Sequence, residues 1–158
     1  MKSLQVGDTA PEFAFSVYDG RRMSLSDFRG QVVVLFFYPA DNTVVCTREA
    51  CSFRDAFQDF RQAGAIVIGV SGDTQSTHAQ FAASKQLPYL IVSDEDGAVR
   101  RTFGVQKRFG LLPGRVTYVI DRDGVVRDVF KSQLLAKRHV DNALRIVRSL
   151  DSQKRGDP

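Results

Sequence analysis

Seven consecutive apolar residues, Val32-Val-Val-Leu-Phe-Phe-Tyr38, followed directly by a proline, restrict the fold of this chain more than any other stretch. Most of them are β-branched or aromatic, a composition typical of a strand that is covered on both faces. Such strands occur in parallel or mixed sheets that lie between layers of helices. The sequence therefore predicts a buried central strand at 32–38.

The rest of the chain alternates between strand-like and helix-like patterns. Asp-Gly pairs at 19–20 and 123–124 lie between alternating apolar and polar runs, which is a strong signal for β-hairpins. The expected elements are a hairpin at 13–24, a capped turn at 24–28, strands at 32–38 and 65–71, helices at 44–63 and 74–86, a strand at 89–92, a short helical turn within 94–104, a hairpin at 115–130 and a helix at 136–150. This order predicts an α/β fold with a mixed central sheet flanked by helices and an N-terminal hairpin extension.

Length and composition suit one soluble domain. The chain has 158 residues, 43% hydrophobic and 25% charged, and we expect one domain over 1–150 and a polar tail over 151–158. No stretch approaches the ~20 apolar residues of a membrane span, and the N-terminus lacks the apolar segment of a secretory signal, so we expect a cytoplasmic protein. The net charge of +4 comes from scattered basic residues, which does not indicate a nucleic-acid partner.

Both cysteines of the chain lie in the stretch 39–55, which links the central strand to the first long helix. Cys46 falls where this helix should begin, and the unpaired N–H groups of a helix N-terminus favour a thiolate. Two cysteines in an intracellular protein do not indicate a disulfide framework. Cys46 and Cys51 together with His78 and His139 could supply four metal ligands, but their spacing matches no familiar zinc pattern, so we expect no metal.

The residues Pro39, Thr43 and Cys46 form the pattern P-x-x-x-T-x-x-C, which resembles the active-site motif of the peroxiredoxins. The five-residue step from Cys46 to Cys51 resembles the Q-type branch, also called bacterioferritin comigratory protein. The segment from Arg115 to Asp121 is similar to the one that carries the active-site arginine of the family. The resemblance extends from about residue 6 to residue 150. It implies a thioredoxin-like fold and the thiol-dependent reduction of hydrogen peroxide and organic hydroperoxides to water and alcohols.

The resemblance also implies roles for individual residues. Cys46 would attack the peroxide and become a sulfenic acid, and Arg115 would stabilise the thiolate with its guanidinium. The hydroxyl of Thr43 could bridge the thiolate and the substrate oxygen, or it could simply cap the helix. Pro39 could shield the sulfur from water or only terminate the strand. Glu49 could pair with an arginine or could only suit the first helical turn electrostatically.

One departure from the family pattern follows the motif threonine. Many relatives carry a proline at the next position, whereas this chain has Val44. Valine leaves an amide N–H that proline lacks and removes some rigidity from the loop. We expect this difference to tune the site without abolishing its chemistry.

Cys51 is the candidate resolving cysteine, which would condense with the sulfenic acid to form a disulfide. Residues five apart on an α-helix are separated by ~7.5 Å of rise and ~140° of rotation, which places their Cα atoms ~8.6 Å apart. A disulfide tolerates only ~7 Å, so an intact helix keeps Cys46 and Cys51 from bonding. Resolution would therefore require the first turns of the helix to unwind. Alternatively, Cys51 is an inert thiol and Cys46 acts with an external thiol.

The implied enzyme uses no metal, haem or flavin and is reduced by thioredoxin or a glutaredoxin-like dithiol donor. It would be a monomer or a weak homodimer. Two other functions stay open: a dithiol oxidoreductase acting on protein disulfides, and a non-catalytic thiol sensor or holdase. The first normally uses C-x-x-C, whereas the spacing here is C-x-x-x-x-C. His78 and His139 lie far from the motif in sequence, and we expect both to be surface or structural residues.

Overall fold

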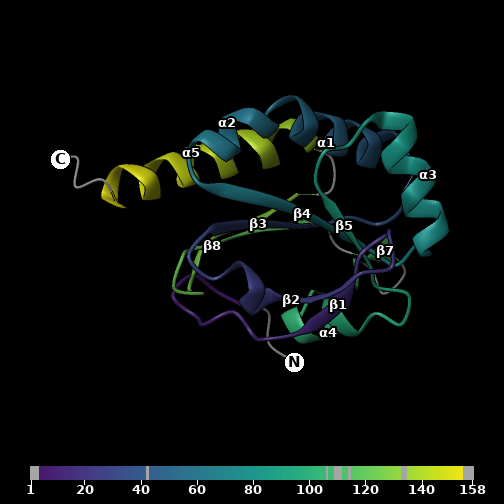
Figure 1. Ribbon diagram of the computed structural model, residues 1–158, viewed down its shortest axis with the longest axis horizontal. Helices are drawn as coiled ribbons and strands as arrows, with labels where there is room; N and C mark the ends of the chain where they lie inside the picture. The colour runs from purple at the N-terminus through teal and green to yellow at the C-terminus, as the bar shows by residue number, and fades with distance from the viewer. Residues whose placement is uncertain are drawn as a thin grey trace.

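A five-stranded mixed sheet forms the centre of the protein (Figure 1). In the computed structural model the strands lie in the order β5-β4-β3-β8-β9, with β3, β4 and β5 parallel and β8 and β9 joined in antiparallel fashion. The strands are β3 (Val32–Phe37), β4 (Ala65–Ser71), β5 (Leu90–Ser93), β8 (Val116–Ile120) and β9 (Val126–Lys131). All residues of β3 are buried, which confirms the predicted central strand.

The structure describes residues 4–41, 43–105, 107–108, 112–113, 115–132 and 135–154. Besides the central sheet, this part of the chain contains a hairpin, a second small two-stranded sheet, a 3-10 turn and several helices. These elements are β1 (Ala14–Ser16), β2 (Arg22–Ser24), η1 (Leu25–Phe28), α1 (Val44–Asp55), α2 (Phe57–Gln62), α3 (Gln75–Lys85), α4 (Ala98–Phe103), β6 (Lys107–Arg108), β7 (Leu112–Pro113) and α5 (Ala136–Lys154). None of the helices described is long and apolar enough to cross a bilayer.

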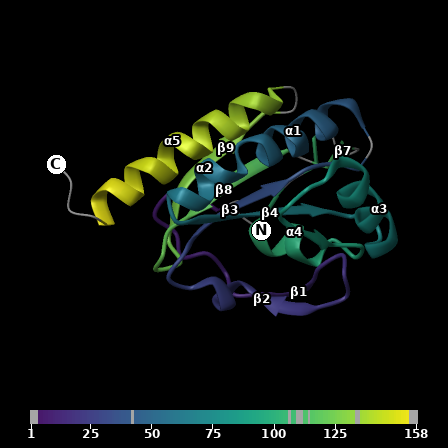
Figure 2. The same cartoon turned by 45° about the horizontal axis from the view of Figure 1, so that its top comes forward.

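Two hydrophobic layers cover the two faces of the sheet. Alternate side chains of a strand point to opposite faces, so Val32, Val34 and Phe36 join the layer beneath α1, α2, α3 and α5. Val33, Leu35 and Phe37 join the opposite layer, which the β1–β2 hairpin and α4 cover. Figures 1 and 2 show the helical layer on one side and the hairpin with α4 on the other. The α/β sandwich and its hairpin extension are thus confirmed.

The long helix expected at 44–63 is two helices, α1 and α2, with a break at Ala56. Ala56 has φ −93° and ψ 4°, outside the α-helical range, and it ends one helix while it begins the other. No glycine or proline marks the break in the sequence, so the hydrophobic period alone could not reveal it. Conversely, α5 continues to Lys154 instead of ending at Leu150.

Candidate active site

Cys46 lies in the first turn of α1, at the end of the loop that follows β3. Thr43 is the N-cap residue, and its carbonyl accepts the N–H of Thr47 at 2.8 Å. The earlier N–H groups of α1 have no partner inside the helix and form the positive end of its dipole. The Cys46 side chain is nevertheless buried, with only 1% of the residue exposed. The sulfur thus lies at the positive end of the helix dipole and is shielded from bulk water.

Arg115 connects the sheet to this cysteine. It precedes β8, and Val116 pairs with Phe37 at the end of β3, so the arginine lies beside the loop that β3 leads into. Its Nη2 donates to the Sγ of Cys46 at 3.2 Å, and its Nη1 donates to Oε1 of Glu49 at 2.7 Å. One guanidinium therefore serves two acceptors, which a lysine could not hold in the same geometry. Glu49 pairs with an arginine, so the first of its two predicted alternatives is confirmed.

Burial dominates the protonation of the residues behind Arg115. Burial raises the pKa of Glu49 from 4.5 to about 7, although the Arg115 guanidinium opposes this shift. Burial also lowers the pKa of His139 from 6.5 to about 4. The pKa of Arg115 is raised, because the attraction of Glu49 and Cys46 outweighs the desolvation of the guanidinium. Glu49 thus titrates near neutrality, while Arg115 keeps its charge.

The structure brings Pro39 and Thr43 into the same loop but gives their side chains no contact with sulfur among the hydrogen bonds described. The Thr43 hydroxyl donates to the carbonyl of Ala40 at 3.0 Å and does not cap α1 with its side chain. The carbonyl of Pro39 accepts from the hydroxyl of Ser71 at 3.4 Å. Val44 is exposed on the first turn of the helix.

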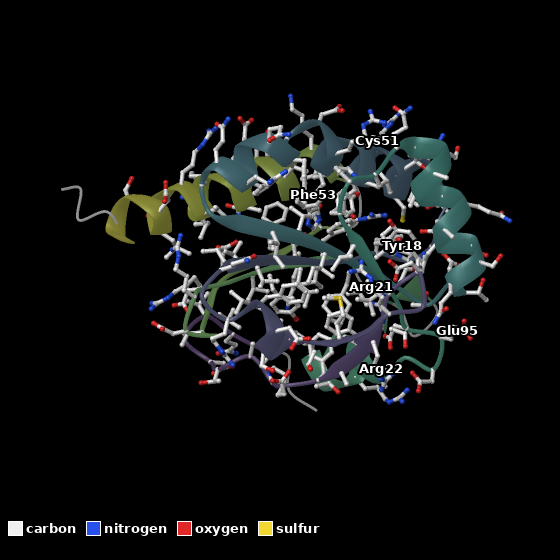
Figure 3. The ribbon with its side chains drawn as sticks, in the orientation of Figure 1. Tyr18, Arg21, Arg22, Cys51, Phe53 and Glu95 are labelled. Atoms are coloured by element: carbon white, nitrogen blue, oxygen red, sulfur yellow. The ribbon has the colours of Figure 1, made fainter. Side chains whose placement is uncertain are left out.

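Cys51 lies on α1, about one and a half turns beyond Cys46, as its position in the sequence requires. Figure 3 shows Cys51 toward the outer side of the helical layer, whereas Phe53 of the same helix points toward the sheet. Both cysteines are free thiols, and the helix that carries them is continuous. The disulfide expected between them is not formed in this structure.

A buried polar cluster that the sequence did not reveal holds the loop after β3. Asp41 accepts a hydrogen bond from the hydroxyl of Tyr38 at 2.6 Å, and its other oxygen is 2.5 Å from Nδ1 of His78. The Asp41 amide donates to Asp73 at 2.6 Å. Asp41, Asp73 and His78 offer ligand atoms within 4.8 Å of one another, but their mutual hydrogen bonds already account for the arrangement. The cluster joins the ends of β3 and β4 to α3.

The two histidines are buried, so of the two predicted alternatives, surface or structural, the structural one applies. His78 and His139 are each 0% exposed, and each makes hydrogen bonds through both ring nitrogens. His139 lies behind the Arg115–Glu49 pair, with Nδ1 at 3.5 Å from Oε2 of Glu49. Distance along the chain hid this contact, because α5 packs beside α1 only in the folded protein (Figure 2).

This fold, with a buried cysteine at a helix N-terminus bound by the arginine that precedes β8, is that of a thioredoxin-fold thiol peroxidase. Residues 6–129 match the model of the AhpC/TSA family. Over 145 residues, the chain is 48% identical to a protein named peroxiredoxin Q, chloroplastic, of Suaeda salsa, covering 91% of this chain and 68% of that protein. The chain therefore belongs to the AhpC/TSA family, in its peroxiredoxin Q group, and is a peroxidase that reduces peroxides through a thiol.

Solved structures agree with this assignment. The crystal structure of the peroxidoxin BcpB from Mycobacterium tuberculosis superposes with a TM-score of 0.86 at 38% identity, covering 93% of this chain and 98% of that one. A bacterioferritin comigratory protein of Xanthomonas campestris, described for its alkyl peroxide reduction activity, superposes with a TM-score of 0.82 at 28% identity, covering 88% and 92%. The predicted thioredoxin-like fold and Q-type membership are confirmed.

The predicted cytoplasmic location is wrong. The matching peroxiredoxin Q proteins of Suaeda salsa, Sedum lineare and Gentiana triflora are all named chloroplastic, and this finding overturns the cytoplasmic prediction. The prediction failed because it relied on the lack of a recognisable leader. The residues that build the fold carry no information on the compartment in which it works.

Proposed function

We propose that Cys46 is the nucleophile of this peroxidase and that Arg115 holds it as a thiolate. The observation that carries the proposal is the 3.2 Å contact from Nη2 of Arg115 to the Sγ of Cys46 in the first turn of α1. Only the thiolate attacks a peroxide at a useful rate, and both the helix terminus and the guanidinium favour the anion. The attack joins the sulfur to one peroxide oxygen and releases the other as water or an alcohol.

Polarisation of the O–O bond requires donors close to the oxygen that leaves. The fork of Arg115 can hold the thiolate and a peroxide oxygen together, because its N–H groups lie in one plane. We assign a second donor to Thr43, whose hydroxyl now bonds the Ala40 carbonyl and could turn toward a bound peroxide. Pro39 shapes the loop and helps to exclude water from the sulfur. These roles of Thr43 and Pro39 require the peroxide to bind beside the loop that joins β3 to α1.

Cys51 resolves the sulfenic acid after the first turns of α1 unwind. In an intact helix the two Cα atoms are ~8.6 Å apart, beyond the ~7 Å that a disulfide tolerates. Two features support unwinding. The Thr43 side chain does not cap α1, and Val44 is 69% exposed, so neither residue holds the start of the helix in place; the buried Cys46, bound by Arg115, is the residue of this turn that oxidation changes. The sulfenic acid and the Cys51 thiol then condense to a disulfide with loss of water.

A dithiol protein of the thioredoxin or glutaredoxin type restores the two thiols. Cys51 is only partly buried and lines a surface pocket between α1 and the start of α5, where a reductant could reach the disulfide. The pocket is lined by Arg48, Cys51, Ser52, Asp55, Leu135, Ala136, Lys137 and Arg138. Its basic residues outnumber its one acid, which favours a partner with acidic groups around its own cysteines.

Stopped-flow measurement of peroxide consumption tests the proposal. Wild type with a catalytic dithiol donor should consume hydrogen peroxide and alkyl hydroperoxides over many turnovers, and Cys46→Ser should lose this activity. Turnover that persists in Cys46→Ser would overturn the assignment of the nucleophile. Peptide mapping after mild oxidation should recover a 46–51 linkage. Its absence would leave Cys46 acting with an external thiol. If peroxide oxidises each protein molecule once and the dithiol donor does not restore it, the protein is a thiol sensor and not a peroxidase.

A further inference from the structure

Behind the thiol site, Glu49 of α1 faces His139 of α5 in the protein interior. Oε1 of Glu49 binds Arg115, but Oε2 has no hydrogen-bond partner among the residues that the structure describes. Nδ1 of His139 lies 3.5 Å from Oε2, and both side chains are 0% exposed. An ionised carboxylate oxygen that is buried without a donor is costly. This contact therefore requires a specific protonation state.

The hydrogen bonds of His139 determine which nitrogen carries its hydrogen. Nε2 lies 2.8 Å from the carbonyl oxygen of Ser132, which can only accept, so Nε2 is the donor. In a neutral ring Nδ1 is then an acceptor, and it lies 2.7 Å from the hydroxyl of Thr117. An ionised Oε2 of Glu49 would face a nitrogen lone pair. Nδ1 offers Oε2 no hydrogen, so the buried carboxyl of Glu49 is favoured in its protonated, neutral form.

Charge balance decides where the proton and the anion lie. The titratable groups that face Glu49 are Arg115, His139, Cys46 and Tyr89. Burial raises the pKa of Tyr89 well above 10, so the phenol is neutral. The Arg115 cation is matched when either Glu49 or Cys46 carries the negative charge. Cys46 has the helix terminus to stabilise its anion, whereas Oε2 of Glu49 has no donor.

We propose that the Glu49–His139 pair stores one proton while Cys46 is a thiolate and releases it when the thiolate is consumed. The inference rests on the proposed role of Cys46. The step is Cys46–S⁻ + ROOH + Glu49–COOH → Cys46–SOH + ROH + Glu49–COO⁻. A sulfur lone pair forms the S–O bond as the O–O bond breaks, so sulfur is oxidised and the peroxide reduced. The leaving oxygen gains one proton and Glu49 gives one up, by way of solvent.

The reaction thus exchanges one anion beside Arg115 for another. Once the sulfur is a neutral sulfenic acid, the Glu49 carboxylate becomes the partner of the guanidinium, with which it already makes a 2.7 Å contact. Glu49 and His139 are positioning residues in this scheme, because they act through Arg115 and do not touch the peroxide. The buried site keeps the same net charge before and after the attack, which avoids an unpaired cation in the interior.

Proton uptake during a single turnover tests the inference. In a Cys51→Ser protein, in weakly buffered solution just below neutrality with a pH indicator, one equivalent of hydrogen peroxide should produce almost no proton uptake. Adding Glu49→Gln should raise the uptake to one proton per sulfenic acid formed, since glutamine has no proton to release. Equal uptake by the two proteins would overturn the inference. Peroxide consumption would continue in that case, so this failure differs from a failure of Cys46 as the nucleophile.

A second variant examines the histidine. The amide of His139→Gln can donate to Oε2 and stabilise the Glu49 carboxylate, which moves negative charge away from Cys46. Alkylation of Cys46 by iodoacetamide at neutral pH should slow by about tenfold, which corresponds to ~1.4 kcal/mol. An unchanged rate in the folded variant would overturn the role of His139. If either variant fails to fold, infrared spectroscopy of the Cys51→Ser protein provides the test. The band of the protonated Glu49 carboxyl should vanish when peroxide oxidises Cys46. A band that persists would overturn the inference.

Discussion

Nη1 of Arg115 lies 2.7 Å from Oε1 of Glu49 in the interior, with 4% and 0% of their side chains exposed. The pair joins the start of β8 to the second turn of α1, and so orients the second arm of the guanidinium toward Cys46. A buried guanidinium with its charged partner contributes little net stability compared with apolar packing. Its presence beside the cysteine is better explained by the chemistry of the thiol than by stability.

Replacing Arg115 by lysine should lower kcat/KM for hydroperoxides by ~10²-fold, comparable to the loss of one donor from an oxyanion hole. Lysine keeps the charge but cannot serve both acceptors in the fork geometry that the structure shows. Stopped-flow kinetics provides the measurement. Arg148→Lys is the matched control, because this arginine is 61% exposed and its ion pair with Asp59 is long, at 3.9 Å. If Arg115→Lys reacts at nearly the wild-type rate, a positive charge at this position is sufficient for catalysis and the fork geometry of arginine is not required.

The buried hydrogen bond between Asp41 and His78 should stabilise both the fold and the active-site loop. His78→Phe keeps an aromatic ring but leaves an Asp41 oxygen without its partner. We expect a loss of about 3 kcal/mol in the free energy of unfolding, as when one member of a buried polar pair is removed. Urea denaturation measures this loss.

Tyr38→Phe removes the other hydrogen bond to Asp41 and serves as the comparison. Its expected cost is smaller, about 1 kcal/mol per hydrogen bond. If His78→Phe costs no more than Tyr38→Phe, the contact with His78 is not a stabilising pair.

The rate of disulfide formation should depend on the helix propensity of α1 between its cysteines. Arg48 is exposed between Cys46 and Cys51, and the variants Arg48→Gly and Arg48→Ala both remove its charge. Glycine lowers helix stability relative to alanine by about 1 kcal/mol. Arg48→Gly should therefore form the 46–51 disulfide about fivefold faster than Arg48→Ala after oxidation by peroxide. Quenched-flow alkylation and mass spectrometry measure the rate, and equal rates would exclude unwinding as the limiting step.

The fold was predictable because its signals are local. The run at 32–38, the Asp-Gly turns and the glycine after α2 each determine structure within a few residues, and the structure has β3, both hairpins and the end of α2 where these signals placed them. The break at Ala56 has no such signal. The small β6–β7 sheet was also missed, because two-residue strands are too short to show any alternation.

The candidate site was predictable only in part. Cys46 could be recognised from the strand, loop and helix around it, whereas Arg115 was distinguished from other basic residues only by its likeness to a family segment. The contacts of Glu49 with His139 and of Asp41 with His78 join residues that are remote in the chain. No periodicity or spacing encodes such contacts, because they arise when α5 packs on α1 and when α3 packs beside the ends of the strands.

The stability of the protein should depend on pH through Glu49 and His139 in opposite directions. Glu49 has its pKa raised from 4.5 to about 7, so its contribution to stability is full below 4.5 and is lost as pH rises through about 7. The shift corresponds to roughly 3 kcal/mol. His139 has its pKa lowered from 6.5 to about 4, so its contribution is full above 6.5 and is lost as pH falls toward 4. The two slopes largely cancel in the window that they share.

Glu49→Gln should remove one of these slopes and expose the other. Between pH 4.5 and 6.5, the free energy of unfolding should rise with pH more steeply than in the wild type, by up to ~1.4 kcal/mol per pH unit. Urea denaturation at a series of pH values measures the difference in slope. Glu95→Gln is the control, because it makes the same chemical change at an exposed position. Parallel curves for wild type and Glu49→Gln would mean that the buried carboxyl does not hold a proton in this range, and the proton store behind Arg115 would then be excluded as well.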